Sequence, residues 1–156
     1  GKEFNCYKFR SMCTNSQEVL DHLLATDPAA KEEWDREFKL KNDPRITKSG
    51  AFLRKTSLDE LPQLLNVLKG EMSLVGPRPL LKSEIQQYYA DSADVLLSVK
   101  PGVTGYWQAY ARNNATYQSG HRQQMEMTYI RQASIWLDCK ILMKTVVAVL
   151  RRDGAK

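Results

Sequence analysis

Long apolar runs are missing from this 156-residue chain. No stretch approaches the roughly 20 consecutive apolar residues that a membrane-spanning helix needs. The first residues also lack the apolar segment of a secretory signal peptide. The sequence as given therefore predicts a chain that does not cross a membrane.

Cysteine and histidine are scarce, with three and two residues respectively. Cys6, Cys13 and Cys139 form no CxxC pair, and His22 and His121 lie far from them in the sequence. This spacing is against a structural zinc site, and an odd number of cysteines favours a reducing compartment over a disulfide framework. We interpret the three cysteines as small apolar side chains that fill space.

Internal repeats, low-complexity tracts and linkers are absent as well. Hydrophobic residues make up 42% of the chain and charged residues 26%, which is typical of one folded domain with a single core. The formal net charge of +5 favours a polyanionic partner. Nucleic acid, an anionic membrane surface and phosphorylated small molecules all fit this charge, which does not choose among them.

Local patterns predict an α+β domain that is rich in helices and has a few short strands. Tyr7 and Phe9 alternate with Lys8 and Arg10, which predicts a strand with one apolar and one basic face. Another strand is expected to end in "SLVGPRPL", and "KPGVTGYWQAYARNN" shows little periodicity except around residues 105–110. Periodicity and breaker residues predict helices from Ser16 (as N-cap) to Asp27, through Trp34 and Phe38, from Asp59 to about Gly70, and over residues 83–89, 92–99, 118–131 and 134–151.

The stretch "SLDELPQ" places two adjacent carboxylates shortly before a proline. Ser57 and Glu60 fit a capping box, but Pro62 would then lie inside the helix, where it removes a hydrogen bond. With Asp59 as the N-cap, Pro62 falls in the first turn, so we expect both carboxylates at the N-terminus of a helix. Capping and catalysis both stay open for this pair. Catalysis on a phosphate would need cations to offset the repulsion, either Arg54 and Lys55 just upstream or a divalent metal.

The stretch "VGPRP" places Arg78 between two prolines, which stiffen the backbone on both sides. A rigidly presented guanidinium suits bidentate binding of phosphate. The alternative is a surface arginine between turn prolines. Lys8 and Arg10 are open to the same two interpretations.

Four blocks of sequence occur in order: "YKFRSM", "RKTSLDELPQLLNVLKGEMSLVGPRPL", "KPGVTGYWQ" and "LDCKILMKTVVAVLRRDGA". Together they resemble the bacterial sugar transferase family, the small monotopic phosphoglycosyl transferases that start polysaccharide assembly on polyprenyl phosphate. The resemblance covers essentially the whole chain. Residues 15–47 and the terminal "LRRDGA" are most similar to the hexose-1-phosphate branch, often specific for galactose.

This resemblance implies a Mg²⁺-dependent enzyme that transfers a hexose-1-phosphate, of galactose or glucose, from a UDP-sugar to undecaprenyl phosphate. Asp59 matches the family nucleophile, which carries the sugar phosphate covalently, and Glu60 matches a general base or metal neighbour. The phosphate-binding positions of the family fall on Lys8, Arg54, Arg78 and Arg112. The metal-binding positions fall on Asp59, Glu60 and Asp138.

The sequence departs from the family pattern in three places. Ala111 replaces the glycine of a Gly-Arg-Asn element, and Glu126 stands where relatives often carry aspartate. Family members have a hydrophobic re-entrant helix before the "YKFRSM" strand, and this sequence begins after that position. We therefore expect residues 1–156 to be a cytosolic catalytic domain without its anchor, acting at the cytoplasmic face of the bacterial inner membrane.

Residue patterns leave the partners of the chain open. Residues 134–151 are largely apolar, but Asp138, Lys140 and Lys144 fall too centrally for a span, so a core helix and a helix at an anionic membrane interface both stay open. A nucleic-acid-binding module and a non-catalytic membrane-surface scaffold are the rival classes of function. The basic residues do not cluster on one element, which is against nucleic acid as a partner. A homodimer stays open.

Overall fold

The computed structural model describes residues 1–37, 40–111 and 119–151, and helices dominate these ranges. The helices are α1 (Ser16–Thr26), α2 (Pro28–Glu37), α3 (Lys48–Lys55), α4 (Gln63–Leu68), α5 (Lys82–Tyr88), α6 (Ala93–Leu97), α7 (Tyr106–Tyr110), α8 (His121–Gln132) and α9 (Ile135–Arg151), with short 3-10 turns η1 (Leu58–Glu60) and η2 (Ala90–Ser92). The strands are β1 (Ser73–Val75) and β2 (Gly102–Thr104). The predicted α+β class, rich in helices with few short strands, is confirmed. Across the described ranges, every helix falls short of the length and apolar character that spanning a bilayer demands.

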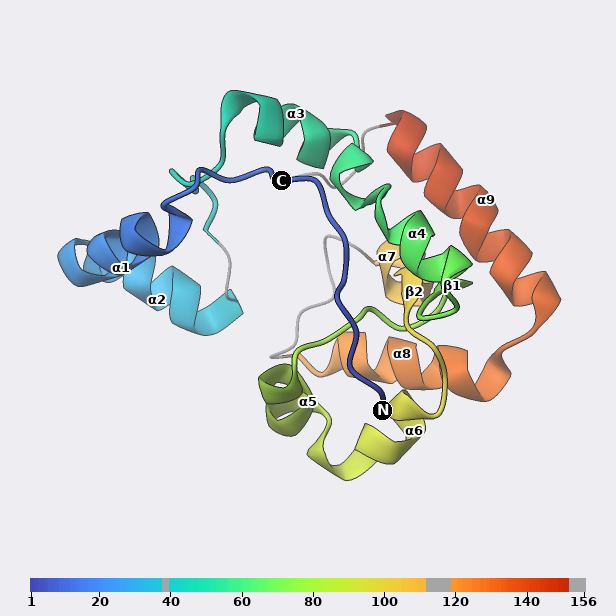
Figure 1. Ribbon diagram of the computed structural model, residues 1–156. Helices are drawn as coiled ribbons and strands as arrows, with labels where there is room; N and C mark the ends of the chain where they lie inside the picture. Colours follow the sequence, from blue (N-terminus) through green and yellow to red (C-terminus); the bar gives the residue numbers. More distant parts are fainter. Residues whose placement is uncertain (38–39, 112–118, 152–156) are drawn as a thin grey trace.

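The two strands form a small parallel sheet in the middle of the molecule (Figure 1). Ser73 lies opposite Gly102, and Val75 lies opposite Thr104. The backbones approach so closely that a Cβ on Gly102 would lie 2.1 Å from the backbone nitrogen of Gly76. Glycine is therefore required at this crossing, and β2 begins in a segment for which the sequence predicts little regular structure.

The core forms where this sheet meets the last two helices. Val75 of β1, Tyr129 of α8 and Ile141 of α9 are buried and pack together. Figure 1 shows α7 and both strands enclosed by α4, α8 and α9. Burial of a side chain such as Val75 or Ile141 stabilises the fold by roughly 1.5–3 kcal/mol. The loop that follows β1 is thus attached to a well-packed part of the molecule.

The first eleven residues run as an irregular segment from the neighbourhood of α6 towards α3 (Figure 1). The predicted strand over residues 7–10 is wrong, because no strand forms there. The Tyr7 N–H donates to Asn66 Oδ1 at 3.1 Å, and the Phe9 N–H donates to the Asp59 carbonyl at 2.9 Å. The backbone N–H groups of this segment thus bond to a side chain and to a turn instead of to a neighbouring strand.

Helices α1 and α2 form a hairpin to one side of the rest of the chain (Figure 1). Asn15 occupies the N-cap of α1, one residue before the predicted Ser16. Asp27 starts α2, its Oδ1 accepting two backbone N–H groups at 2.9 and 3.1 Å. An isolated antiparallel bridge between Met12 and Ile46 joins the chain before α1 to the chain after α2.

Candidate active site

Asp59 and Glu60 lie in the 3-10 turn η1, immediately before α4. The prediction that Asp59 is the N-cap is wrong, because Pro62 holds that position and no side chain caps α4. The cause lies at Ser57, whose φ of 56° puts it in the left-handed region that non-glycine residues rarely adopt. Ser57 turns the chain into η1, so α4 begins only at Gln63. The carboxylates project from a tight turn beside the helix N-terminus.

The charge of Asp59 is set by its neighbours. Burial and the negative charge of Glu60 raise the pKa of Asp59 above its ordinary value, against the opposing charges of Lys8 and Arg54. A cation would relieve this repulsion, and carboxylate oxygens are ligands that Mg²⁺ prefers. Since Mg²⁺ usually takes one or two carboxylates together with phosphate oxygens, the pair fits this ion.

Glu60 faces an open groove with basic residues on its walls. Lys8 Nζ lies 2.7 Å from Glu60 Oε1, with the two side chains 40% and 30% exposed. Lys8, Glu60 and Arg78 line the same groove, whose volume is about 1460 Å³. All three charges act on the thiol of Cys6, whose pKa is raised chiefly by burial. The three side chains therefore surround one region of the groove.

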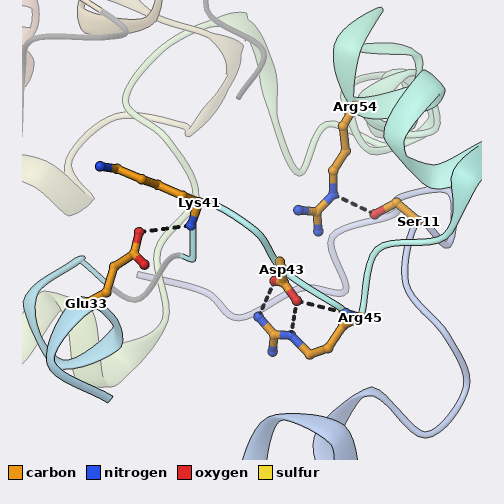
Figure 2. A network of polar contacts seen from close by, with 6 residues as sticks. All are labelled: Ser11, Glu33, Lys41, Asp43, Arg45 and Arg54. Carbon is orange, nitrogen blue, oxygen red and sulfur yellow. Dashed lines mark hydrogen bonds and ion pairs between the residues drawn. The ribbon is translucent and has the colours of Figure 1, made fainter. Parts of the chain in front are cut away.

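Arg54 approaches Asp59 from α3. Its Nε donates to Ser11 Oγ at 2.9 Å, as Figure 2 shows. Ser11 is fixed in turn, since its carbonyl accepts the Thr47 N–H at 3.1 Å and a Cβ on Gly50 would lie 1.9 Å from that oxygen. Ser11 thus orients a guanidinium whose charge acts on the predicted nucleophile. Sequence reasoning missed Ser11, although it lies in the "YKFRSM" block.

A buried ion pair between Asp43 and Arg45 lies in the same region as Arg54 (Figure 2). Arg45 Nη2 lies 2.7 Å from Asp43 Oδ2, with the side chains 9% and 5% exposed, and Arg45 lies over the Trp34 ring of α2. Burial opposes ionisation of Asp43, but hydrogen bonds from Arg45 and the charges of Arg45 and Arg54 lower its pKa. This pair connects the α1–α2 hairpin to the residues that surround Arg54.

The "VGPRP" loop is attached to a buried acid behind it. The Arg78 N–H donates to Glu126 Oε1 at 3.4 Å, and the Tyr89 hydroxyl donates to Glu126 Oε2. Glu126 is 1% exposed, and burial raises its pKa despite the hydrogen bond from Tyr89 and the charge of Arg122. The guanidinium of Arg78 makes no ion pair with any residue in the described ranges. The loop backbone is thus fixed while its side chain lines the groove.

One of the predicted site residues, Asp138, lies apart from this group. Asp138 Oδ1 accepts the Tyr129 hydroxyl at 2.9 Å in the first turn of α9. Helix α9 contributes to the cavity wall beside Glu60 only from Thr145 onward. Thr145 lies about 10 Å from Asp138 along the helix axis, at 1.5 Å per residue. In the part of the chain that the structure describes, no three His, Cys, Asp or Glu side chains gather as a metal site. Arg112 lies outside the described residues.

Sequence reasoning missed several amide side chains at the site. Asn66 is fully buried, accepting the Tyr7 N–H and donating to Glu71, which holds the N-terminal segment against α4. Gln63 is 2% exposed and lines the groove. Gln108 also lines it, and its Oε1 has no hydrogen-bond partner among the described residues. The sequence held a signal for Asn66 and Gln63, because both are polar amides within the apolar run "QLLNVL".

This arrangement suits chemistry at phosphorus, because cationic side chains can bind phosphate oxygens while a carboxylate attacks. The family model of the bacterial sugar transferases matches residues 1–152. The chain belongs to the bacterial sugar transferase family.

Individual relatives agree with this assignment. An "Undecaprenyl-phosphate galactose phosphotransferase" of Salmonella typhimurium is 58% identical over 155 residues, which is 99% of this chain and 32% of that protein. A "UDP-galactose-lipid carrier transferase" of Erwinia amylovora is 55% identical over 99% of this chain and 32% of its own length. The "Exopolysaccharide production protein ExoY" of Rhizobium meliloti is 46% identical over 99% of this chain and 67% of its own length. The chain spans about a third of the length of the first two.

Proposed function

We propose that this domain transfers a hexose-1-phosphate, of galactose or glucose, from a UDP-sugar to undecaprenyl phosphate and so starts synthesis of an O-antigen, capsule or exopolysaccharide. The names of the relatives support the two substrates. The observation that carries the proposal is the position of Asp59, a partly buried carboxylate on which Lys8, Arg54 and Glu60 all act.

In the first step, a carboxylate oxygen of Asp59 attacks the β-phosphorus, which bears the sugar. The bond from this phosphorus to the bridging oxygen breaks, UMP leaves with the electron pair, and an acyl phosphate remains on Asp59. Lys8 and Arg78 bind the phosphate oxygens. Arg54, held by Ser11, favours the ionised nucleophile.

In the second step, a phosphate oxygen of the lipid acceptor attacks the same phosphorus. The bond to Asp59 breaks, which regenerates the carboxylate and yields a polyprenyl diphosphate sugar. Glu60 accepts the proton when the acceptor phosphate arrives singly charged. Lys8, which pairs with Glu60 at 2.7 Å, is then available to bind phosphate.

We assign the predicted Mg²⁺ to Asp59 and Glu60, where it would offset the charge of the diphosphate. Asp138 stays a predicted ligand that lies apart from this pair. Chelation with EDTA should abolish release of UMP, and added Mg²⁺ should restore it. The measurement is a coupled UMP assay on the full-length protein, and unchanged turnover in excess chelator would contradict the assignment.

A lipid acceptor requires contact with a membrane. Apolar side chains of α4 and α9 are exposed, and we define the apolar face by Leu65, Leu68, Ile135, Trp136 and Met143, which are 54–84% exposed. Both helices lie on the same side of the molecule (Figure 1). Exposed Lys140 and Lys144 on α9 suit anionic headgroups. We therefore place this face against the cytoplasmic surface of the inner membrane.

Substitution of the nucleophile tests the reaction. Asparagine keeps the size of Asp59, so Asp59→Asn should fold with near-normal stability, yet an amide cannot form the mixed anhydride. We expect no UMP release and no covalent adduct by mass spectrometry. Glu60→Gln should slow turnover and let the adduct accumulate, and Asp91→Asn, at an exposed position of η2, is the matched control. An Asp59→Asn protein that gains the mass of a hexose phosphate would disprove the mechanism.

A further inference from the structure

A second, smaller cavity lies beside the groove, between η1, α4, β2, α7 and α9. Its volume is about 150 Å³. The apolar part of its wall consists of Leu61, Leu64, Val103, Ala148 and Val149. The reaction steps above leave this cavity without a role.

Two hydroxyl groups in the wall are already satisfied within the protein. Thr145 donates to the Ile141 carbonyl at 2.8 Å. Thr104 must therefore be the donor in its 2.8 Å contact with Thr145 Oγ1. Neither hydroxyl has a proton left to donate, so this side of the cavity offers a ligand no hydroxyl donor.

The cavity meets the groove at Glu60, Val103 and Gln108, which line both. Lys8 and Arg78 lie on the groove side of this junction. A ligand that crosses the junction therefore has an anionic head with a hydrocarbon group directly attached.

The cavity has the size of one small hydrocarbon unit, since an apolar cavity of roughly 150 Å³ can hold a benzene molecule. Leu61 and Leu64 in its wall are 48% and 42% exposed. The cavity is thus continuous with the exposed apolar residues of α4, and a longer chain can leave it on that side.

We propose that this cavity binds the first isoprene unit of the lipid acceptor and so sets the adjoining phosphate beside Glu60. The inference rests on the proposed transfer reaction and adds a site for the hydrocarbon of the acceptor. The UDP-sugar then enters from the groove and the lipid from the side of α4 and α9. The uridine base is the rival occupant. If it occupied the cavity, filling the cavity would abolish UMP release instead of transfer to the lipid alone.

Filling the cavity separates the two half-reactions. Ala148→Phe places a ring inside it, and Val147→Phe, at the neighbouring position that is 42% exposed, is the matched control. In the full-length protein, single-turnover UMP release and adduct formation should be unchanged in both variants. Transfer to undecaprenyl phosphate in detergent micelles should fall at least about tenfold in Ala148→Phe alone, through a higher KM for the acceptor.

Unchanged transfer in Ala148→Phe would overturn the inference. Loss of UMP release at an unchanged unfolding temperature would overturn it too, by assigning the cavity to the nucleotide. A wild-type protein that forms no adduct would instead remove the proposed function itself. A second measurement needs no variant: dimethylallyl phosphate should compete with the lipid at concentrations at least about tenfold lower than ethyl phosphate. Equal competition by the two compounds would also overturn the inference.

Discussion

The pKa of Asp59 is subject to opposing effects of burial and of the surrounding charged side chains. Burial and Glu60 favour its neutral form, whereas Lys8 and Arg54 favour the carboxylate. The first pair prevails, and the pKa of Asp59 is raised. In the proposed mechanism only the ionised form of Asp59 attacks phosphorus. The burial and the nearby Glu60 charge that would suit a cation therefore also reduce the reactive fraction in acid.

The proposed nucleophile gives a pH dependence with a definite sign. The rate of adduct formation should be maximal at pH values above the raised pKa of Asp59. It should decrease as the pH falls through this pKa. Glu60→Gln removes one cause of the shift, so the midpoint should move to lower pH. Single-turnover UMP release measured against pH checks this, with the exposed Glu18→Gln as control. A midpoint for Glu60→Gln at or above the wild-type value would refute the electrostatic argument.

The sequence contains the residue types of the site but not their supporting contacts. The carboxylate pair and Arg78 stand out through turn chemistry and the family blocks. The bond from Arg54 to Ser11 joins positions 43 apart, and that from Arg78 to Glu126 joins positions 48 apart. Local patterns extend over a few residues, so they cannot predict such pairs.

At the scale of elements, helices were easier to predict than strands. Breakers such as Asp27-Pro28 end helices by local sterics, and α1 and α9 lie close to their predicted bounds. The helix expected through Trp34 and Phe38 is observed as α2, and Phe38 lies outside the described residues. A strand needs a distant partner, and alternation alone at residues 7–10 did not provide one. Strand β2 starts at Gly102 because of close backbone packing, which hydrophobic periodicity does not record.

Gly50, near the start of α3, packs so closely against Ser11 of the N-terminal segment that there is no room for a side chain. In Gly50→Ala the new Cβ would collide with the Ser11 carbonyl oxygen, so we expect a loss of about 1–3 kcal/mol in the free energy of unfolding. Because Ser11 orients Arg54, kcat/KM for the UDP-sugar should fall as well. Ser49→Ala, one residue earlier in the same helix, is the control. Denaturant titration and UMP assays that match wild type would contradict the packing argument.

The whole molecule combines a groove with basic walls and an apolar face. Length and composition predict a single α+β domain, but not which side of α9 faces inward. Ile141 is buried while Trp136 of the same helix is 80% exposed. The core role left open for this helix is therefore confirmed, and contact with a membrane stays a prediction.

The apolar face should decide binding to lipid vesicles. Leu68→Glu and Trp136→Glu should each weaken binding of the domain to phosphatidylglycerol–phosphatidylethanolamine vesicles about tenfold or more, because burying one large apolar side chain contributes roughly 1.5–3 kcal/mol. Val95→Glu, at an exposed position of α6, should bind like wild type. Co-sedimentation at low and high salt separates this apolar contribution from that of the lysines. Equal binding by all variants would show that another surface meets the lipid.

Met12 and Ile46 pair across one bridge, and helices α1 and α2 lie between these two positions in the sequence. The entropic cost of closing the segment between them grows only logarithmically, by about 0.6 kcal/mol for each doubling of its length. Evolution can therefore lengthen, trim or exchange the α1–α2 hairpin without altering the spacing of the groove residues. A deletion series within this hairpin, scored by the free energy of unfolding, would measure that tolerance. The hairpin is thus a place where specialisation can accumulate on a fixed reaction chemistry.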